Sequence, residues 1–218
     1  DYLEEAIKRP IPISSYLPEL YLSADEQSWP SPVTLEHGYV GPYWILNAGV
    51  KTDYELKQYP YWQDVVRVLH QRGITCVQVG ERSHEHPLVD GAIDLRGKTT
   101  LRQLFRLSYH AEGALCAVSL QMVIMAALQK PCVVVNGGRE GTRWQLNNQH
   151  RFLTTVGALP CCRLDGCWKS KRSECLDWLK AEAVPHCMQL ITPAAVVEAV
   201  ELYYEGGVLT RARSEVLV

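Results

Sequence analysis

Short apolar runs alternate along this chain with segments that have the hydrophobic period of a helix. The runs at residues 43–46 and 74–79 both end in turn-forming residues, as buried strands do. Between them, apolar side chains recur at positions i, i+3, i+4 and i+7: Trp62, Val65, Val66 and Leu69. Gly73 follows and predicts the end of that helix. This alternation constrains the fold strongly, because strands joined by helices form parallel sheets.

The same pattern continues towards the C-terminus. The next predicted elements are a strand, a strand, a helix and a strand, at residues 92–95, 114–118, 119–128 and 132–135. Thr100 is placed to cap one helix, and Pro193 to begin another that ends before Gly206. We therefore predict an α/β fold, a Rossmann-like parallel sheet with helices on both faces. Ligands of such sheets bind beyond the carboxyl ends of the strands.

The two ends of the chain differ in composition from its middle. Residues 1–40 are rich in proline and turn formers, which predicts an extended connector or a strap over a domain. The Rossmann-like domain is expected over residues 41–158 and a cysteine-rich insertion over 159–190. A helix and a tail complete the chain over residues 191–218. The absence of an initiator methionine leads us to expect a fragment or a processed product.

Charge and hydropathy exclude several classes of partner. The formal net charge of −2 gives no broad attraction for nucleic acid or for an anionic membrane. We interpret the basic run at residues 169–172 as a solvated loop. No apolar run approaches the roughly 20 residues that span a bilayer, and the acidic N-terminus does not resemble a signal peptide. These features favour a cytoplasmic protein with no membrane span and no nucleic-acid partner.

Two loops that follow predicted strands carry residues suited to a phosphorylated ligand. Lys51 and Lys57 stand just before a helix and can neutralise a phosphate, although a solvated turn is the alternative. In the next loop Glu81 can accept hydrogen bonds from two ligand hydroxyls at once. The neighbouring His84 and His86 suggest a metal site as an alternative, but no third ligand stands out in the sequence.

A third loop and a helix start are also suited to bind an anion. Paired Gly137 and Gly138 after a buried strand let backbone amides approach an anion, and Arg139 and Arg143 can bind its oxygens in pairs. The spacing is not that of a P-loop. Ser119 opens a predicted helix, so its hydroxyl can contact a diphosphate. A plain helix cap is the alternative for that serine.

The cysteines are concentrated in one short segment. Five of the eight lie between Cys161 and Cys187, as in a local metal site of a reduced protein. Four thiolates suit a tetrahedral structural zinc or iron ion, and we assign these ligands: Cys162, Cys167, Cys175 and Cys187. The alternatives are reduced structural cysteines or oxidised pairs. The remaining cysteines, in predicted strands, are interpreted as core residues: Cys76, Cys116 and Cys132.

Taken in order, these segments resemble the C-terminal half of glycosyltransferase family 9, the lipopolysaccharide heptosyltransferases. The motifs that carry the resemblance are KQYP at 57–60, VQVGE at 77–81, LRGKTTLR at 95–102 and KPCVV at 130–134. A bacterial subgroup shares three more features: GGRE followed by Trp, CC followed by GCWK, and a terminal YYEGG. The resemblance implies the GT-B fold, with the donor nucleotide-sugar, such as ADP-heptose, held by this half. It also implies a separate N-terminal domain that holds a glycan or protein acceptor.

The resemblance assigns roles to individual residues. Lys57 is expected to neutralise donor phosphate, Glu81 to bind the nucleotide ribose or base, and Ser119 to approach the diphosphate. The reaction implied is an inverting transfer of a sugar, and some members bind iron through cysteines. Where the family has an acidic residue, a glycine and a histidine, this chain has three apolar residues: Val118, Leu120 and Val123. A non-catalytic binding or scaffold subunit derived from the same fold is therefore the alternative function.

Overall fold

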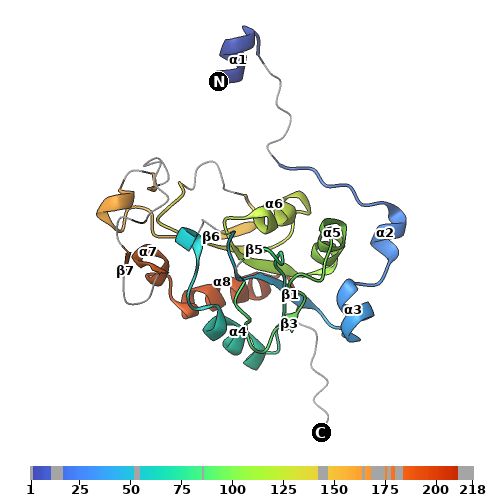
Figure 1. Ribbon diagram of the computed structural model, residues 1–218. Coiled ribbons are helices and arrows are strands. Elements are labelled where there is room, and N and C mark those ends of the chain that lie inside the picture. Colours follow the sequence, from blue (N-terminus) through green and yellow to red (C-terminus); the bar gives the residue numbers. More distant parts are fainter. Residues whose placement is uncertain are drawn as a thin grey trace.

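The computed structural model is a layered α/β protein (Figure 1). It describes residues 2–10, 17–51, 55–84, 86–141, 147–163, 165–167, 175, 178–179 and 184–210. The six strands of its main sheet are β1 (Tyr43–Asn47), β2 (Thr75–Gln78), β3 (Ile93–Asp94), β4 (Gly113–Ala117), β5 (Cys132–Gly137) and β6 (His150–Thr154). All of their pairings are parallel, as the alternation of strands and helices predicted.

The order of the strands is β3-β2-β1-β4-β5-β6. The chain therefore builds outwards from β1 in one direction, returns to β4 and continues in the other direction. Parallel sheets with this reversal open a crevice at the carboxyl ends of the two central strands, because the connections leave on opposite sides there. Here those two strands are β1 and β4, which pair in register from Trp44–Gly113 to Asn47–Cys116.

Helices cover both faces of the sheet, as predicted. One face carries α4 (Trp62–Gln71) and α8 (Pro193–Glu205), and the other carries α5 (Leu101–His110), α6 (Leu120–Ala127) and the short α3 (Pro32–His37) (Figure 1). Alternate residues of β1 point to opposite faces, so Trp44 packs with the first layer and Ile45 with the second. Both are fully buried. A strand buried on both faces must be apolar throughout.

The helix boundaries follow the local signals in the sequence. Thr100 and Gln103 form a reciprocal capping box at the start of α5. Thr192 caps α8 with Pro193 as the first helical residue. The buried side of α4 consists of the four residues that the periodicity selected: Trp62, Val65, Val66 and Leu69.

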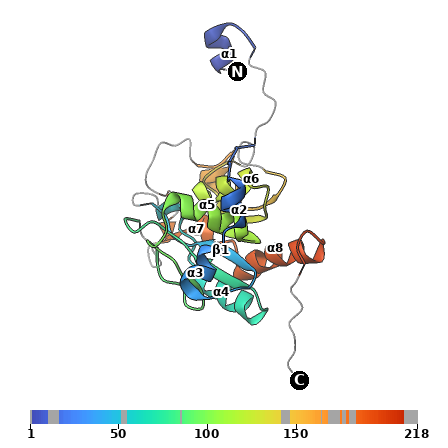
Figure 2. The ribbon, with the colours of Figure 1, turned by 90° about the vertical axis from the view of Figure 1, so that its right-hand side faces the viewer.

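The part of the N-terminal segment that contains α2 (Ala24–Ser28) and α3 lies against the second helical layer as a strap, and the segment has more structure than its proline content suggested. It contains α1 (Tyr2–Ile7), α2 and α3. Figure 2 shows α2 beside α5, where the guanidinium of Arg102 donates to the carboxylate of Glu26 at 2.6 Å. Val33 is fully buried in the core, which we did not expect of a connector.

The remaining elements are short. They are η1 (Glu55–Lys57), η2 (Pro160–Cys162), β7 (Trp178–Leu179), β8 (Val184–Pro185) and α7 (His186–Gln189). The strands β7 and β8 pair in an antiparallel hairpin. None of the helices in the described part of the chain has both the length and the apolar character that crossing a membrane requires.

Candidate functional site

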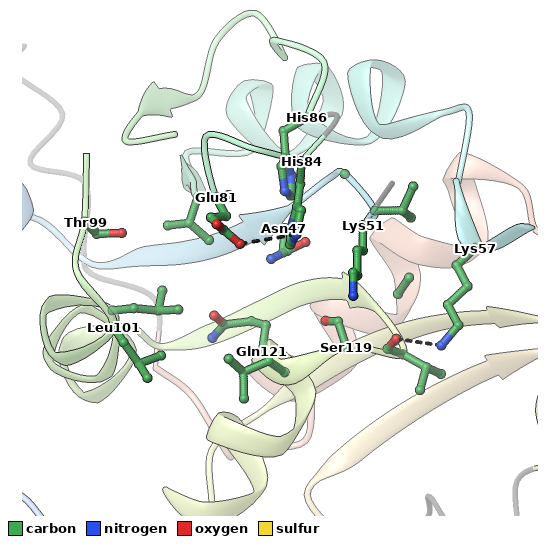
Figure 3. Close-up of a pocket in the computed structure, with 18 of the residues that line it drawn as sticks. Asn47, Lys51, Lys57, Glu81, His84, His86, Thr99, Leu101, Ser119 and Gln121 are labelled. Carbon is green, nitrogen blue, oxygen red and sulfur yellow. Dashed lines mark hydrogen bonds and ion pairs between the residues drawn. The ribbon is translucent and has the colours of Figure 1, made fainter. Parts of the chain in front are cut away.

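A cavity of about 620 Å³ opens at the carboxyl ends of β1 and β4, where the strand order reverses. That volume is in the range of small-molecule sites. The loops after β1, β2 and β4 and the start of α5 line it, and three of the predicted donor-binding residues are among the lining residues: Lys57, Glu81 and Ser119 (Figure 3). The topology thus gathers side chains that are up to 62 positions apart in the sequence.

Lys57 lies at one end of the cavity and is paired with a carboxylate that the sequence analysis did not select. Its ammonium group forms an ion pair with Glu140, which is 7% exposed, and donates to the carbonyl of Val118 at 3.3 Å. The pair joins the loop after β1 to the loop after β5. A phosphate that approaches Lys57 therefore meets a cation whose charge Glu140 already balances in part.

Glu81 lies at the mouth of the cavity. Its side chain is 66% exposed, accepts a hydrogen bond from the Ser83 hydroxyl at 2.8 Å and lies 3.2 Å from His84 Nε2. The ring of His86 packs so closely on Gly80 that a Cβ there would collide with it. Burial lowers the pKa of His86, and His84 and Arg96 lower it further against the opposing effect of Glu81, which favours the neutral imidazole.

The N-terminus of α6 forms part of the cavity floor. Ser119 is the N-cap, with an extended backbone, but its hydroxyl makes no capping bond. Its buried Oγ has no hydrogen-bond partner among the described residues. The amides of the first helical turn and this hydroxyl are therefore suited to an anion. Leu120 and Val123, which stand where the family has glycine and histidine, are 55% and 41% exposed.

Gly137 and Gly138 are placed elsewhere. Neither lines the cavity, and both face the cysteine-rich segment. A Cβ on Gly137 would lie 2.5 Å from the sulfur of Met188, and one on Gly138 would lie 2.9 Å from that of Cys162. The loop that we interpreted as an anion site is thus packed against protein. Arg139 shares a small recess beside the cavity with Lys57, and Arg143 lies outside the described residues.

The four cysteines assigned to a metal lie near one another. Burial raises the pKa of the Cys187 thiol to about 11, and the other three thiols raise it further, which requires them to be close: Cys162, Cys167 and Cys175. Thiols in reach of one another fit the donor set of a tetrahedral zinc or iron ion. Within the described part of the chain, however, no group of three or more Cys, His, Asp or Glu residues has an arrangement that could hold a metal ion. The structure shows proximity but no formed metal site.

Two residues of the candidate site, one in the cavity and one in the recess beside it, were missed in the sequence. Glu140 belongs to the glycine-rich loop, but its pairing with Lys57 depends on a contact 83 positions away. Gln121 gave a signal that could have been used, because it is a polar residue inside the otherwise apolar run at 120–128. Its side chain is buried and lines the cavity.

The strand order and the crevice define a Rossmann-like α/β fold, and the solved structures that resemble it include glycosyltransferases. Escherichia coli ADP-heptose LPS heptosyltransferase II matches 91% of this chain and 57% of its own, with 16% identity and a TM-score of 0.63. A glycosyltransferase of family 9 from Veillonella parvula DSM 2008 matches 88% of this chain and 55% of its own, with 13% identity and a TM-score of 0.62.

A third match is the iron-containing dodecameric glycosyltransferase TibC of enterotoxigenic E. coli H10407. It covers 77% of this chain and 46% of its own, with 19% identity and a TM-score of 0.56. The same enzyme has been solved with ADP-D-β-D-heptose. No protein-family model and no curated protein sequence matches this chain. The matches confirm, at the level of the fold, the resemblance to glycosyltransferase family 9, and the chain spans about half the length of these proteins.

Proposed function

We propose that this chain is the donor-binding part of a heptosyltransferase-like enzyme. The observation that carries the proposal is the cavity between β1 and β4, where Lys57, Glu81 and Ser119 converge. The ligand would be a nucleotide-sugar such as ADP-heptose, the compound bound by TibC. Transfer to a glycan or protein acceptor would need a second, N-terminal domain, since the similar enzymes are about twice as long.

The residues at the end of the cavity near Lys57 suit the chemistry of a leaving diphosphate. In an inverting transfer, negative charge grows on the diphosphate as the bond to the sugar breaks. Lys51, Lys57 and the amides at the start of α6 can stabilise that charge without large movements. Glu81 at the mouth can accept hydrogen bonds from ribose hydroxyls. Arg139 lies beside this end and is a further candidate for a phosphate oxygen.

One observation favours the alternative, a binding or scaffold subunit without turnover. Val118, Leu120 and Val123 offer no acid, base or hydrogen-bond donor from their side chains where the family has an acidic residue and a histidine. Val118 and Leu120 line the cavity. The two functions differ in turnover and share the donor site, so consumption of ADP-heptose in the presence of an acceptor domain separates them.

A structural metal is the second part of the proposal. The mutual proximity of the four thiols supports a zinc or iron ion held by Cys162, Cys167, Cys175 and Cys187. Elemental analysis should find about one equivalent of metal per chain. Native protein that contains no metal and in which these four cysteines react with a thiol reagent would contradict this assignment.

Calorimetric titration with ADP tests the donor site. Lys57→Met should abolish most of the binding and also lower the free energy of unfolding by about 3 kcal/mol, because it removes the ammonium group that pairs with the buried Glu140 carboxylate. Adding Glu140→Gln should restore stability but not binding. Glu140→Gln alone should strengthen binding, since it removes a competing negative charge.

Lys98→Met is the matched control, because Lys98 is exposed and does not line the cavity. It should leave both affinity and stability unchanged. Binding of ADP by the Lys57→Met protein with wild-type affinity would remove the basis of the proposed donor site.

A further inference from the structure

Gln121 is a buried polar residue whose hydrogen bonding is only half complete. It is 1% exposed, lies in the first turn of α6 and lines the cavity. Its side-chain nitrogen Nε2 donates to the hydroxyl of Ser108 on α5 at 3.0 Å. Its oxygen Oε1 is buried and has no partner among the residues that the structure describes. In Figure 3 the carboxamide lies on the floor of the cavity, near Leu101.

The orientation of this carboxamide is fixed by the bonding of Ser108. The Ser108 hydroxyl has one proton, and it donates that proton to the carbonyl of Leu104 at 2.8 Å. Ser108 can therefore only accept from Gln121, so the amide nitrogen must face α5. The opposite orientation would bring two acceptors together. The oxygen is thus held on the other side of the amide, where a ligand donor can reach it.

An acceptor left unsatisfied in a buried position costs about 1–3 kcal/mol. Ser119 Oγ, two residues away, is also buried without a partner in the described structure. A helix that leaves two such groups at the same cavity is arranged for a bound molecule to complete them. Ser119 can either donate or accept a proton, whereas Gln121 Oε1 requires a donor.

The surroundings of Gln121 indicate which part of a ligand supplies that donor. Leu101 of α5 lies at the same end of the cavity as Gln121 (Figure 3), and Leu104 and Val79 also line the cavity. The cationic groups Lys51 and Lys57 lie towards the other end (Figure 3). A ligand whose phosphates lie at Lys51, Lys57 and the start of α6 can therefore extend its other end towards the Gln121 carboxamide. The part that reaches the glutamine must be an apolar, compact group that carries an N–H or O–H donor, as a nucleobase with an amino group does.

We propose that Gln121 determines the base specificity of this site by accepting a hydrogen bond from the exocyclic amino group of an adenine-type base. The inference rests on the proposed donor site and assigns the recognition of its base to a residue held by Ser108. A base without the amino group leaves Oε1 unsatisfied and binds more weakly. Sites built around a hydrogen bond reject analogues that lack it far better than apolar pockets reject a change in size.

The test compares ADP with purine riboside 5′-diphosphate, in which hydrogen replaces the amino group. Both have the same phosphates, sugar and ring shape. The wild-type chain should bind ADP at least about tenfold more tightly, as judged by calorimetric titration. Equal affinities would overturn the inference while leaving the donor site intact, because water would then satisfy Gln121. Binding of neither compound would refute both the donor site and the inference.

A variant of Gln121 tests whether its Oε1 atom causes the preference for ADP. Gln121→Met keeps the length of the side chain and removes the acceptor, so the two diphosphates should bind with equal affinity. Met122→Leu is the matched control, as a volume-conserving change at the next position, outside the cavity lining. It should keep the preference for ADP. A Gln121→Met protein that retains the full preference would contradict the assignment, and the wild-type comparison stands if that variant does not fold.

Discussion

Two loops at the carboxyl edge of the sheet differ in their surroundings: one borders a cavity, and the other is packed against side chains. The loop after β4 leads into α6 and borders an open cavity, with buried polar atoms that have no partner among the described residues. The loop after β5 is filled, because Met188 and two cysteines pack directly on Gly137 and Gly138. Both loops follow a fully buried strand of the same parallel sheet.

The difference shows that glycine after a buried strand is not by itself evidence of a ligand. The missing side chain at Gly138 makes room for sulfur and not for phosphate. In contrast, the loop after β4 has no glycine and remains open, since β1 and β4 send their connections to opposite sides of the sheet. Position in the topology is here a better guide to the binding site than loop composition.

The largest effect should come from filling the space at the packed loop. Gly137→Ala should destabilise the protein by about 3 kcal/mol, because the new Cβ lies 2.5 Å from Met188 Sδ in a backbone conformation with φ of +61°. Gly157→Ala is the control, with φ of +93° and open space around its Cβ. It should cost about 1 kcal/mol. Equal losses in urea unfolding would show that the loop after β5 is not tightly filled and would weaken the comparison.

A second test uses buried groups without a partner at the opposite edge of the sheet. Both ring nitrogens of His150, at the start of β6, lack a partner in the described structure, and burial lowers its pKa from 6.5 to about 4. The unfolded chain therefore takes up a proton first as the pH falls. The contribution of His150 to the free energy of unfolding should be fully present above pH 6.5. The free energy of unfolding should decrease by about 2 kcal/mol as the pH falls towards 4.

His150→Gln should remove most of that decrease, as measured by urea unfolding at several pH values. The exposed His37→Gln is the control and should leave the pH dependence unchanged. Because His150 does not line the cavity, ADP should not alter its contribution. An ADP-dependent change would mean that the two edges of the sheet are not independent.

The smallest effect separates a helix cap from a ligand contact. Ser119→Ala should keep or slightly raise stability, since the hydroxyl makes no capping bond and is buried without a partner in the described structure, but should weaken ADP binding about fivefold. Thr192→Ala should have the opposite pattern, with lower stability and unchanged ADP affinity. It removes a side-chain cap from α8 at a residue that does not line the cavity, and should cost about 1 kcal/mol of stability without changing affinity. If Ser119→Ala costs stability alone, the serine is a cap and the open loop loses one ligand contact.

Most of the architecture could be predicted, because each signal was local. The four-residue apolar face of α4, the Thr100 cap and the strands β1, β2, β4 and β5 are all encoded by neighbouring residues. The edge strand β6 was missed, and its residues are half-buried or exposed, with the charged Arg151 among them. An edge strand is covered on fewer sides, so its sequence need not be apolar.

The candidate site was only partly predictable, because its contacts are not local. Sequence order and family resemblance selected Lys57, Glu81 and Ser119, and the topology places all three at one cavity. The same reasoning could not show that Cys162 and Cys187 fill the space beside Gly138. Nor could it show that Ser108 fixes the amide of Gln121, since that depends on how α5 packs against α6.

The ion pair between Lys57 and Glu140 has a consequence for how the two loops communicate. Glu140 stands two positions after Gly138, so the residue that balances the lysine belongs to the loop held by the sulfur-containing side chains. An anion that drew Lys57 away from Glu140 would remove the ion pair that joins this loop to the loop after β1. By thermodynamic reciprocity, whatever fixes the sulfur-rich segment in place must change the affinity for the anion by the same factor.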